Sequence, residues 1–288
     1  MSFQKRLKDC NKYKESNFFK FFINNYRIGF IKKKNLNIIN KFPEFFIINN
    51  QKIFLRKEIN NFQKKTYAIN QVFNFLVKKK MILSKHREYF PVFNSFKSKP
   101  LLKVQRLVGP FFGFQFFGVH VNGFLKENNK YFMWVGRRSK KGNFPNDFDQ
   151  IAAGGLPFNC TLKKNLIKEC YEEANINKTL ALKSKYKGTI SYRVESNLGL
   201  SRHILFCYNL ELTKSFVPKN NDGEITNFYL WPIEKILKII KQSRKFKFDC
   251  ALVILLFASN KKIIQIKKIR SVLNNKEDLK ILKKIKKN

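Results

Sequence analysis

Three glutamates stand close together in the segment Lys168-Glu169-Cys170-Tyr171-Glu172-Glu173. Their spacing is i, i+3 and i+4, so on a helix the three carboxylates would share one face. Carboxylates packed in this way repel one another, and the arrangement makes sense where a cation is bound. Hard divalent ions such as Mg²⁺ take oxygen ligands and bridge to substrate phosphates. The segment therefore indicates metal-assisted phosphate chemistry, with a solvated acidic helix face as the plain alternative.

The composition makes this cluster stand out. The 288 residues carry 59 Lys+Arg against 19 Asp+Glu, a formal net charge of +40, which excludes functions that need an acidic surface. Lys, Asn, Ile and Phe dominate the chain and share AT-rich codons, so codon bias is a simpler explanation for the charge than selected nucleic-acid binding. Salt-sensitive association with polyanions follows in either case.

Cysteine usage and hydropathy point to a protein without a zinc site or a membrane span. The five cysteines are odd in number and scattered, with no C-x-x-C pair. The longest apolar stretch, 250–258, is too short to cross a bilayer, and the N-terminus lacks the apolar region of a secretory signal. We therefore expect reduced thiols, a cytoplasmic location and no membrane partner.

The elements that must position the glutamates can be read from periodicity. A helix over about 164–175 places Leu166, Cys170 and Ala174 toward a core. The pair Gly154-Gly155 before it allows a tight turn and a close approach of the backbone to substrate. The patterns predict strands at 116–124, 131–137, 188–194, 203–212 and 228–231, and helices at 57–80, 233–240 and 246–258.

Two arginines end a predicted strand just before this segment. Arg137 and Arg138 could each grip phosphate oxygens through two parallel hydrogen bonds. Adjacent strand residues point to opposite faces, so at most one of them is expected to do so. His120 alternates with Val119 and Val121 and is more simply a core histidine than a catalytic one.

The segment from Gly155 to Ile176 resembles the Nudix box, in which Gly, five residues, Glu and seven residues precede Arg-Glu-apolar-x-Glu-Glu-x-Gly-apolar. KECYEEANI matches its second half, with Lys168 in place of Arg and Asn175 in place of Gly. The spacing is one residue short, and no acid lies between Gly155 and Glu169. Because of these departures, a protein that has lost its activity is an alternative interpretation.

The order of other segments resembles one Nudix branch, which carries an extra N-terminal region and is associated with thiamine pyrophosphokinase. The segments are FGVHVNGF, MWVGRRS, AGGLP, GTISYRVES, ILFCYNLEL, FVPKNNDGEI and KFKFDC, with a looser match in RLKDCNKY, IGFI and FPEFF. The likeness runs from about Leu7 to about Ala258.

This resemblance implies a fold, a division of the chain and an activity. The fold would be the Nudix α/β/α sandwich with a mixed sheet, preceded by a smaller α+β region. Residues 1–105 would form that N-terminal region, 106–258 the Nudix domain, and 259–288 a basic tail, most simply a solvated helix. The activity would be hydrolysis of damaged thiamine diphosphate, the oxothiamine or oxythiamine form, to the monophosphate.

The resemblance also implies roles for individual residues. Glu169, Glu172 and Glu173 would hold Mg²⁺ or Mn²⁺, with the identity of the general base left open. Glu224, in a late loop before a strand, would add a ligand or base. Arg137, Arg138, Gly154 and Gly155 would contact the substrate. The alternatives are a Nudix hydrolase of another nucleoside diphosphate-linked substrate and an inactive basic binding module on the same scaffold. No specific nucleic-acid partner is expected, and the oligomeric state stays open.

Overall fold

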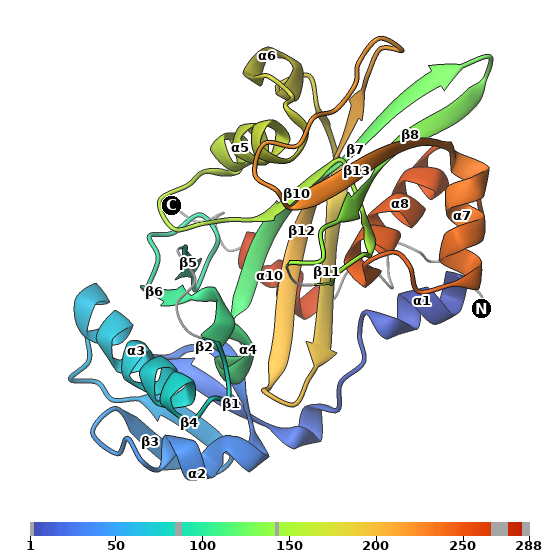
Figure 1. Ribbon diagram of the computed structural model, residues 1–288. Helices are drawn as coiled ribbons and strands as arrows, with labels where there is room; N and C mark the ends of the chain where they lie inside the picture. Colours follow the sequence, from blue (N-terminus) through green and yellow to red (C-terminus); the bar gives the residue numbers. More distant parts are fainter. Residues whose placement is uncertain (1–2, 84–87, 142–143, 266–275, 284–288) are drawn as a thin grey trace.

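A large mixed sheet forms the centre of the molecule (Figure 1). The computed structural model describes residues 3–83, 88–141, 144–265 and 276–283. Within these residues the sheet has seven strands in the order β11-β12-β7-β8-β13, with β10 paired to β7 and β9 to β8. The strands are β7 (Gln115–Glu127), β8 (Lys130–Arg138), β9 (Phe148–Asp149), β10 (Ala152–Gly155), β11 (Lys185–Glu195), β12 (Leu200–Glu211) and β13 (Ile225–Pro232). β12 runs parallel to β7, and the other pairings are antiparallel.

Helices cover both faces of this sheet. The helices that follow β10 are α5 (Leu162–Ala174) and α6 (Lys178–Ala181), and the late helices are α7 (Ile233–Gln242), α8 (Phe248–Asn260) and α10 (Lys276–Lys283). Leu166 and Cys170 of α5 pack on Val119 and Val121 of β7. On the other face, α7 and α8 pack with the N-terminal helix α1 (Phe3–Asp9). The α/β/α sandwich expected from the sequence is therefore present.

A second, smaller layer lies beside the large sheet. Its four strands, in the order β2-β1-β4-β3, are β1 (Phe18–Ile23), β2 (Tyr26–Lys32), β3 (Phe46–Asn49) and β4 (Lys52–Leu55). A two-stranded unit, β5 (Tyr89–Val92) and β6 (Leu102–Gln105), joins it. The helices of this part are α2 (Leu36–Ile39), α3 (Phe62–Lys78) and α4 (Gly109–Phe112), with 3-10 turns η1 (Glu15–Asn17), η2 (Lys33–Asn35) and η3 (Arg106–Val108). Phenylalanines such as Phe21 and Phe112 fill its core.

The elements predicted from periodicity are present with small shifts of their ends. The buried apolar run 250–258 lies in α8, and the helix predicted at 164–175 is α5. The turn between β7 and β8 places Asn128 and Asn129 at φ 46° and 61°, a conformation that asparagine tolerates. His120 is buried and hydrogen-bonds Gln150, and burial lowers its pKa, so it is a core histidine as predicted.

Two expectations are wrong in detail. Gly154 and Gly155 lie in strand β10, paired to Val119 and Gly118, and form no tight turn. Helix α10 in the tail is not a solvated helix, because Asp278 is only 1% exposed and is held by two arginines. The tail residues 259 and 260 end α8, and the tail residues 266–275 and 284–288 lie outside the described residues.

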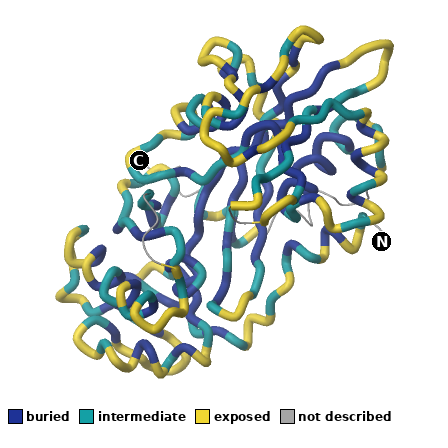
Figure 2. The backbone as a smooth tube through the Cα atoms, in the orientation of Figure 1, coloured by how far each residue is buried: buried dark blue, intermediate teal, exposed yellow. Residues whose placement is uncertain are grey.

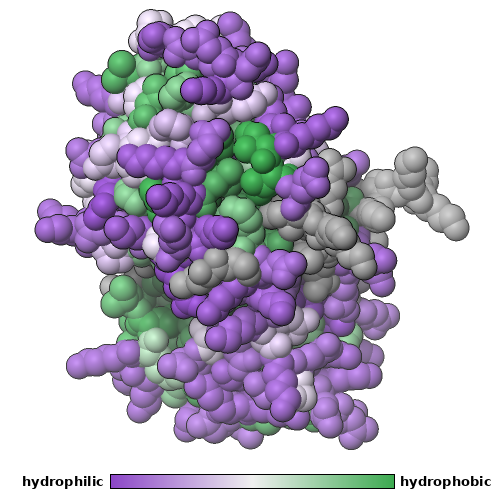
Figure 3. Space-filling model, turned by 90° about the vertical axis from the view of Figure 1, so that its right-hand side faces the viewer, coloured by the Kyte–Doolittle hydropathy of each residue, from purple (hydrophilic) through white to green (hydrophobic). Residues whose placement is uncertain are grey.

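The burial pattern follows the layers. Figure 2 shows buried backbone along the strands of the large sheet and exposed backbone at the loops around it. Figure 3 shows hydrophilic residues over most of one face, with a hydrophobic area near its middle. No helix among the described residues is long and apolar enough to span a membrane.

Candidate active site

Helix α5 carries the three glutamates and is fixed at both ends. Thr161 caps its N-terminus, with its hydroxyl oxygen accepting the Lys164 N–H at 3.2 Å. Asn175 ends it in the left-handed conformation, φ 54°. Glycine commonly takes this position because it has no Cβ, and asparagine is the next best residue. The replacement of the box glycine by Asn175 is therefore compatible with the helix end.

The glutamates do not share one solvated face. Glu169 and Glu173 are 7% and 2% exposed and lie against β10, beside the core-facing residues of α5, while Glu172 lies at the outer edge. The Glu173 carboxylate accepts the Ala153 N–H at 2.9 Å. A solvated acidic helix face thus fails to describe two of the three side chains.

Gly154 makes room for one of these carboxylates. A Cβ at Gly154 would lie 2.0 Å from Cδ of Glu169 and 2.2 Å from each carboxylate oxygen. A Cβ at Gly155 would instead lie 2.5 Å from the Phe90 ring. The glycine pair therefore serves close packing at two different neighbours, and only Gly154 accommodates a glutamate.

Burial changes the proton affinity of the two inner glutamates. Burial raises the pKa of Glu169 to about 7, against the opposing effect of Lys168. Burial also raises the pKa of Glu173 well above its usual range, and the nearby charges of Asp149, Glu169 and Glu224 add to this. Two carboxylates that are costly to ionise, and that repel when ionised, suit a site that a cation neutralises.

Lys168, at the box arginine position, already supplies one positive charge. Its Nζ lies 3.4 Å from Glu169, 3.0 Å from Glu172 and 3.2 Å from Glu88. Within the described ranges no three acidic, histidine or cysteine side chains are grouped as a ready metal cage. The oxygen donors of Glu169 and Glu173 nevertheless fit a hard divalent ion, because they are buried, adjacent and not neutralised in full by Lys168.

The loop before β13 is docked on the C-terminal end of α5. Asn221 donates its backbone N–H to the Glu172 carbonyl at 2.8 Å and its side-chain amide to the Tyr171 carbonyl at 2.8 Å. Asn220 donates to the Glu173 carbonyl at 3.3 Å. These bonds satisfy the Glu172 and Glu173 carbonyls, which have no partner within α5, and give the Tyr171 carbonyl a second donor besides the Asn175 N–H. They also bring Glu224 to the same side of the sheet as the glutamate helix.

Arg138 connects Glu224 to a buried acid that sequence reasoning missed. It donates from Nη1 to Asp149 at 2.8 Å and from Nη2 to Glu224 at 3.3 Å, and the charge of Glu173 also reaches it. Burial alone would raise the pKa of Asp149, but Lys247 and Arg138 outweigh it and hold that pKa below the usual range. Asp149 lies in a two-residue strand, too short for any periodic signal.

Arg137 takes the other side of β8. Its guanidinium lies 5.2 Å from the Phe148 ring centroid, a cation–π contact on the α7 and α8 side. The structure thus brings Glu169, Glu173, Glu224 and Arg138 together, leaves Glu172 at the rim, and separates Arg137 from them.

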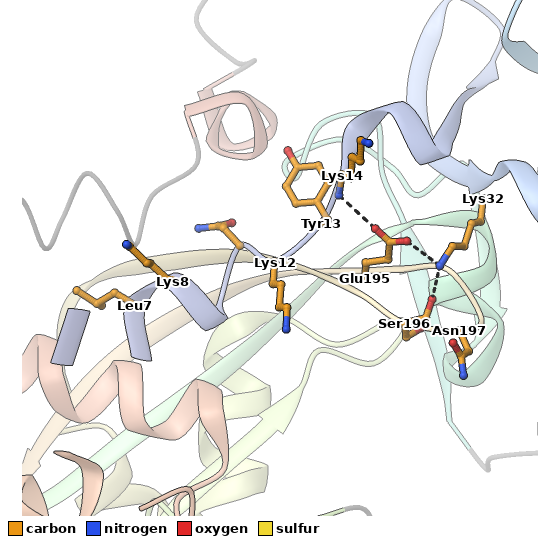
Figure 4. Close-up of a pocket in the computed structure, with 10 residues that line it drawn as sticks. Leu7, Lys8, Lys12, Tyr13, Lys14, Lys32, Glu195, Ser196 and Asn197 are labelled. Carbon is orange, nitrogen blue, oxygen red and sulfur yellow. Dashed lines mark hydrogen bonds and ion pairs between the residues drawn. The ribbon is translucent and has the colours of Figure 1, made fainter. Parts of the chain in front are cut away.

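One pocket lies away from the acidic site. It has a volume of about 870 Å³ and lies between the segment after α1 and the turn joining β11 to β12 (Figure 4). Lys32 pairs with Glu195 there at 2.7 Å, and Glu195 also accepts the Lys14 N–H at 3.2 Å. None of its lining residues belongs to the acidic site.

Comparison with known proteins decides the family. The chain is 33% identical over 260 residues to Nudix hydrolase 24, chloroplastic, and 32% identical over 267 residues to Nudix hydrolase 20, chloroplastic, both from Arabidopsis thaliana. Each alignment covers 88% of this chain and 71% of the relative.

The chain belongs to the Nudix hydrolase family. It is accordingly a pyrophosphohydrolase that acts on a diphosphate-containing substrate, and Nudix hydrolases in general use divalent metal ions. The expected cytoplasmic location is contradicted by these relatives, since both are named as chloroplastic.

Two further similarities concern parts of the chain. Residues 2–116 match a family described as a domain of unknown function, DUF4743. Among solved structures, the Nudix domain of Shewanella oneidensis NrtR complexed with ADP ribose is 12% identical, with a TM-score of 0.40 over 52% of this chain and 89% of that one. That likeness is too low to transfer anything to this chain, whose fold is evident from its own sheet and helices.

Proposed function

We propose that this Nudix hydrolase cleaves the diphosphate of damaged thiamine diphosphate, in its oxothiamine or oxythiamine form, and releases the monophosphate. The observation that carries the diphosphate chemistry is the pair of buried glutamates, Glu169 and Glu173, packed together against β10. Support for the thiamine skeleton comes from the ordered segments shared with the thiamine-associated branch, from about Leu7 to about Ala258.

In this proposal Glu169, Glu172 and Glu173 hold Mg²⁺ or Mn²⁺. A bound divalent ion supplies positive charge to the diphosphate and lowers the pKa of an attacking water. The protein's own part is positioning, because phosphoryl transfer needs mostly orientation and charge stabilisation. The backbone at Gly154 allows Glu169 to come close, and the Ala153 N–H holds one oxygen of Glu173.

We assign the remaining residues by their neighbours. Glu224 is a further ligand or base, oriented by Arg138. Arg138 is the better candidate for a phosphate contact, since Arg137 packs on Phe148. Gly154 and Gly155 shape the floor of the substrate site. We also propose that the chain divides into residues 1–105, 106–258 and 259–288. In this division, the first part shapes the pocket for the organic end of the substrate.

The test is hydrolysis of thiamine diphosphate, oxothiamine diphosphate and oxythiamine diphosphate with Mg²⁺ or Mn²⁺, with every product identified. Glu172→Gln removes a proposed ligand with little risk to folding, because the side chain is at the rim. Glu234→Gln, an exposed glutamate of α7, is the matched control. We expect preferential conversion of the damaged forms to monophosphates, lost in Glu172→Gln and kept in Glu234→Gln.

Two other results separate the alternatives. Turnover of other diphosphates, such as nucleotide sugars or dinucleotides, without turnover of the thiamine compounds would keep the enzyme and remove the thiamine assignment. Absence of metal-dependent turnover across the whole panel would leave a basic binding protein on a Nudix scaffold.

A further inference from the structure

Three arginines from distant parts of the chain converge on one phenylalanine. Arg193 of β11 and Arg202 of β12 are directly paired across the sheet, and they are 1% and 7% exposed. Arg27 comes from β2 of the smaller sheet. The guanidinium carbons of Arg27, Arg193 and Arg202 lie 5.1, 5.4 and 5.0 Å from the ring centroid of Phe30. Positive charges that are buried, as those of Arg193 and Arg202 are, require anions close by.

The chain supplies these anions from the first turn of α10. Arg193 donates from Nε and Nη2 to the two carboxylate oxygens of Asp278, at 2.9 and 2.8 Å, which is the two-pronged geometry of guanidinium and carboxylate. Arg202 donates to the same carboxylate at 2.6 Å. Glu277 pairs with Arg193 at 2.9 Å and with Arg27. Among the residues that the structure describes, three cations thus face two carboxylates, which leaves a net positive charge there.

The rest of α10 covers an aromatic surface that continues toward the glutamate helix. Phe117 and Val119 are two residues apart on β7 and so share a face of the sheet, and Val119 packs under α5. The Ile281 carbonyl accepts the Phe96 N–H at 3.1 Å. Three apolar residues of α10, namely Leu279, Ile281 and Leu282, pack in a cluster with Phe93, Phe96, Phe117, Leu156, Cys160, Leu162, Ile204, Phe206 and Tyr208. Leu156 and Cys160 belong to the segment that leads into α5.

We propose that Arg27, Arg193 and Arg202 form a binding site for a phosphate or diphosphate group, and that α10 is an internal occupant which such a ligand displaces. A phosphate presents two oxygens to a guanidinium fork in the same way as the Asp278 carboxylate does. The aromatic surface beside the arginines fits a ring attached to that phosphate. Displacement of α10 would uncover the face of the sheet that leads to α5. The inference goes beyond the proposed function, because binding at the arginines can be measured without turnover.

The size of α10 makes displacement feasible. Eight residues do not form a stable helix on their own, so the order of α10 depends on these contacts. As a tethered segment it competes at an effective concentration on the order of millimolar. A ligand must bind the arginines strongly enough to displace α10. If the internal carboxylates are removed, the ligand should bind at a much lower concentration.

The experiment measures binding of inorganic pyrophosphate to the full chain by calorimetry, with EDTA present and ionic strength held constant. The variant Glu277→Gln/Asp278→Asn removes the internal anions, and Glu44→Gln/Glu58→Gln removes two exposed carboxylates elsewhere as a charge-matched control. We expect the first variant to bind pyrophosphate at least tenfold more tightly than the wild type and the control. Adding Arg202→Gln to that variant should abolish the gain.

Hydrogen exchange gives a second, independent result on the unaltered chain. Saturating pyrophosphate should speed amide exchange in residues 276–282, because α10 is released. Equal affinity of all variants would mean adsorption by net charge, and unchanged exchange of α10 would mean that the helix is a permanent part of the fold. Either result overturns the proposal. Should the double variant fail to fold, the exchange result on the wild type decides alone.

Discussion

The substitution Gly154→Ala tests whether the position of the Glu169 carboxylate matters for the reaction. The new Cβ would lie 2.0 Å from Cδ of Glu169, whereas ordinary contact begins at 3.4 Å. The carboxylate must therefore move by at least 1.4 Å, the difference between these two distances. The movement has to be taken up by Glu169, because Gly154 is fixed in β10 by its pairing with Val119.

A displacement of this size has a calculable effect. Misplacement of a catalytic group by about 1 Å can cost about 100-fold in rate. We therefore expect kcat/KM for the diphosphate substrate to fall by about 100-fold, which corresponds to about 2.7 kcal/mol. The assay is metal-dependent hydrolysis, with a urea unfolding curve to show that the variant is folded.

Gly109→Ala, in α4, is the matched control, because its Cβ would lie 2.2 Å from the Phe116 ring and not against a carboxylate. It should lower stability and leave kcat/KM within about threefold of the wild type once folded. In Gly154→Ala, adding Glu169→Asp shortens the side chain, so the stability effects of the two changes should be non-additive. A folded Gly154→Ala protein with wild-type kcat/KM would refute the assigned role of Glu169.

Three further outcomes follow from the site. Burial raises the pKa of Glu169 to about 7, so its contribution to stability is fully present below pH 4.5 and is lost as pH rises through 7. Urea unfolding with EDTA should show that the unfolding free energy falls by up to about 3 kcal/mol between pH 5 and 8, and Mg²⁺ should offset this fall. An unfolding free energy that does not change over this pH range would contradict the prediction. Arg138→Met should cost about 3 kcal/mol in unfolding free energy, because Asp149 loses a buried partner, while Arg137→Met should cost about 1 kcal/mol; equal losses would contradict the assignment. Asn175→Ala should lower the thermal midpoint by a few degrees, corresponding to about 1 kcal/mol, and Asn175→Gly should not, because only alanine is strained at φ 54°.

The sequence predicts secondary structure correctly wherever a segment has a regular spacing of apolar residues. The 3.6-residue period gave α5 with Leu166 and Cys170 toward the core, and the uninterrupted apolar run gave α8. Alternation around His120 identified it as a core residue. These features follow from local geometry, because a helix or strand repeats its side-chain directions whatever it packs against.

The same periodicity could not tell which acids would be buried. Glu169, Glu172 and Glu173 fit the helical spacing equally well. Only the contact with β10 distinguishes the two buried carboxylates from the one at the rim. Glycine permits a tight turn, so the sequence favours one at Gly154-Gly155, whereas in the structure Gly154 is needed for the space that Glu169 fills. Whether a side chain is buried depends on the segment that packs against it, and that segment lies elsewhere in the chain.

Local patterns in the chain are enough to predict the glutamate helix, the alternating strands and the type of chemistry that clustered carboxylates can support. Only the packing of the chain shows that Arg138 pairs with both Asp149 and Glu224, and that Asp278 pairs with both Arg193 and Arg202. The physical reason is that charge pairing depends on distance in space. Arg138 and Glu224 are 86 residues apart in the chain, and Arg202 and Asp278 are 76 apart, so no local period indicates that they meet.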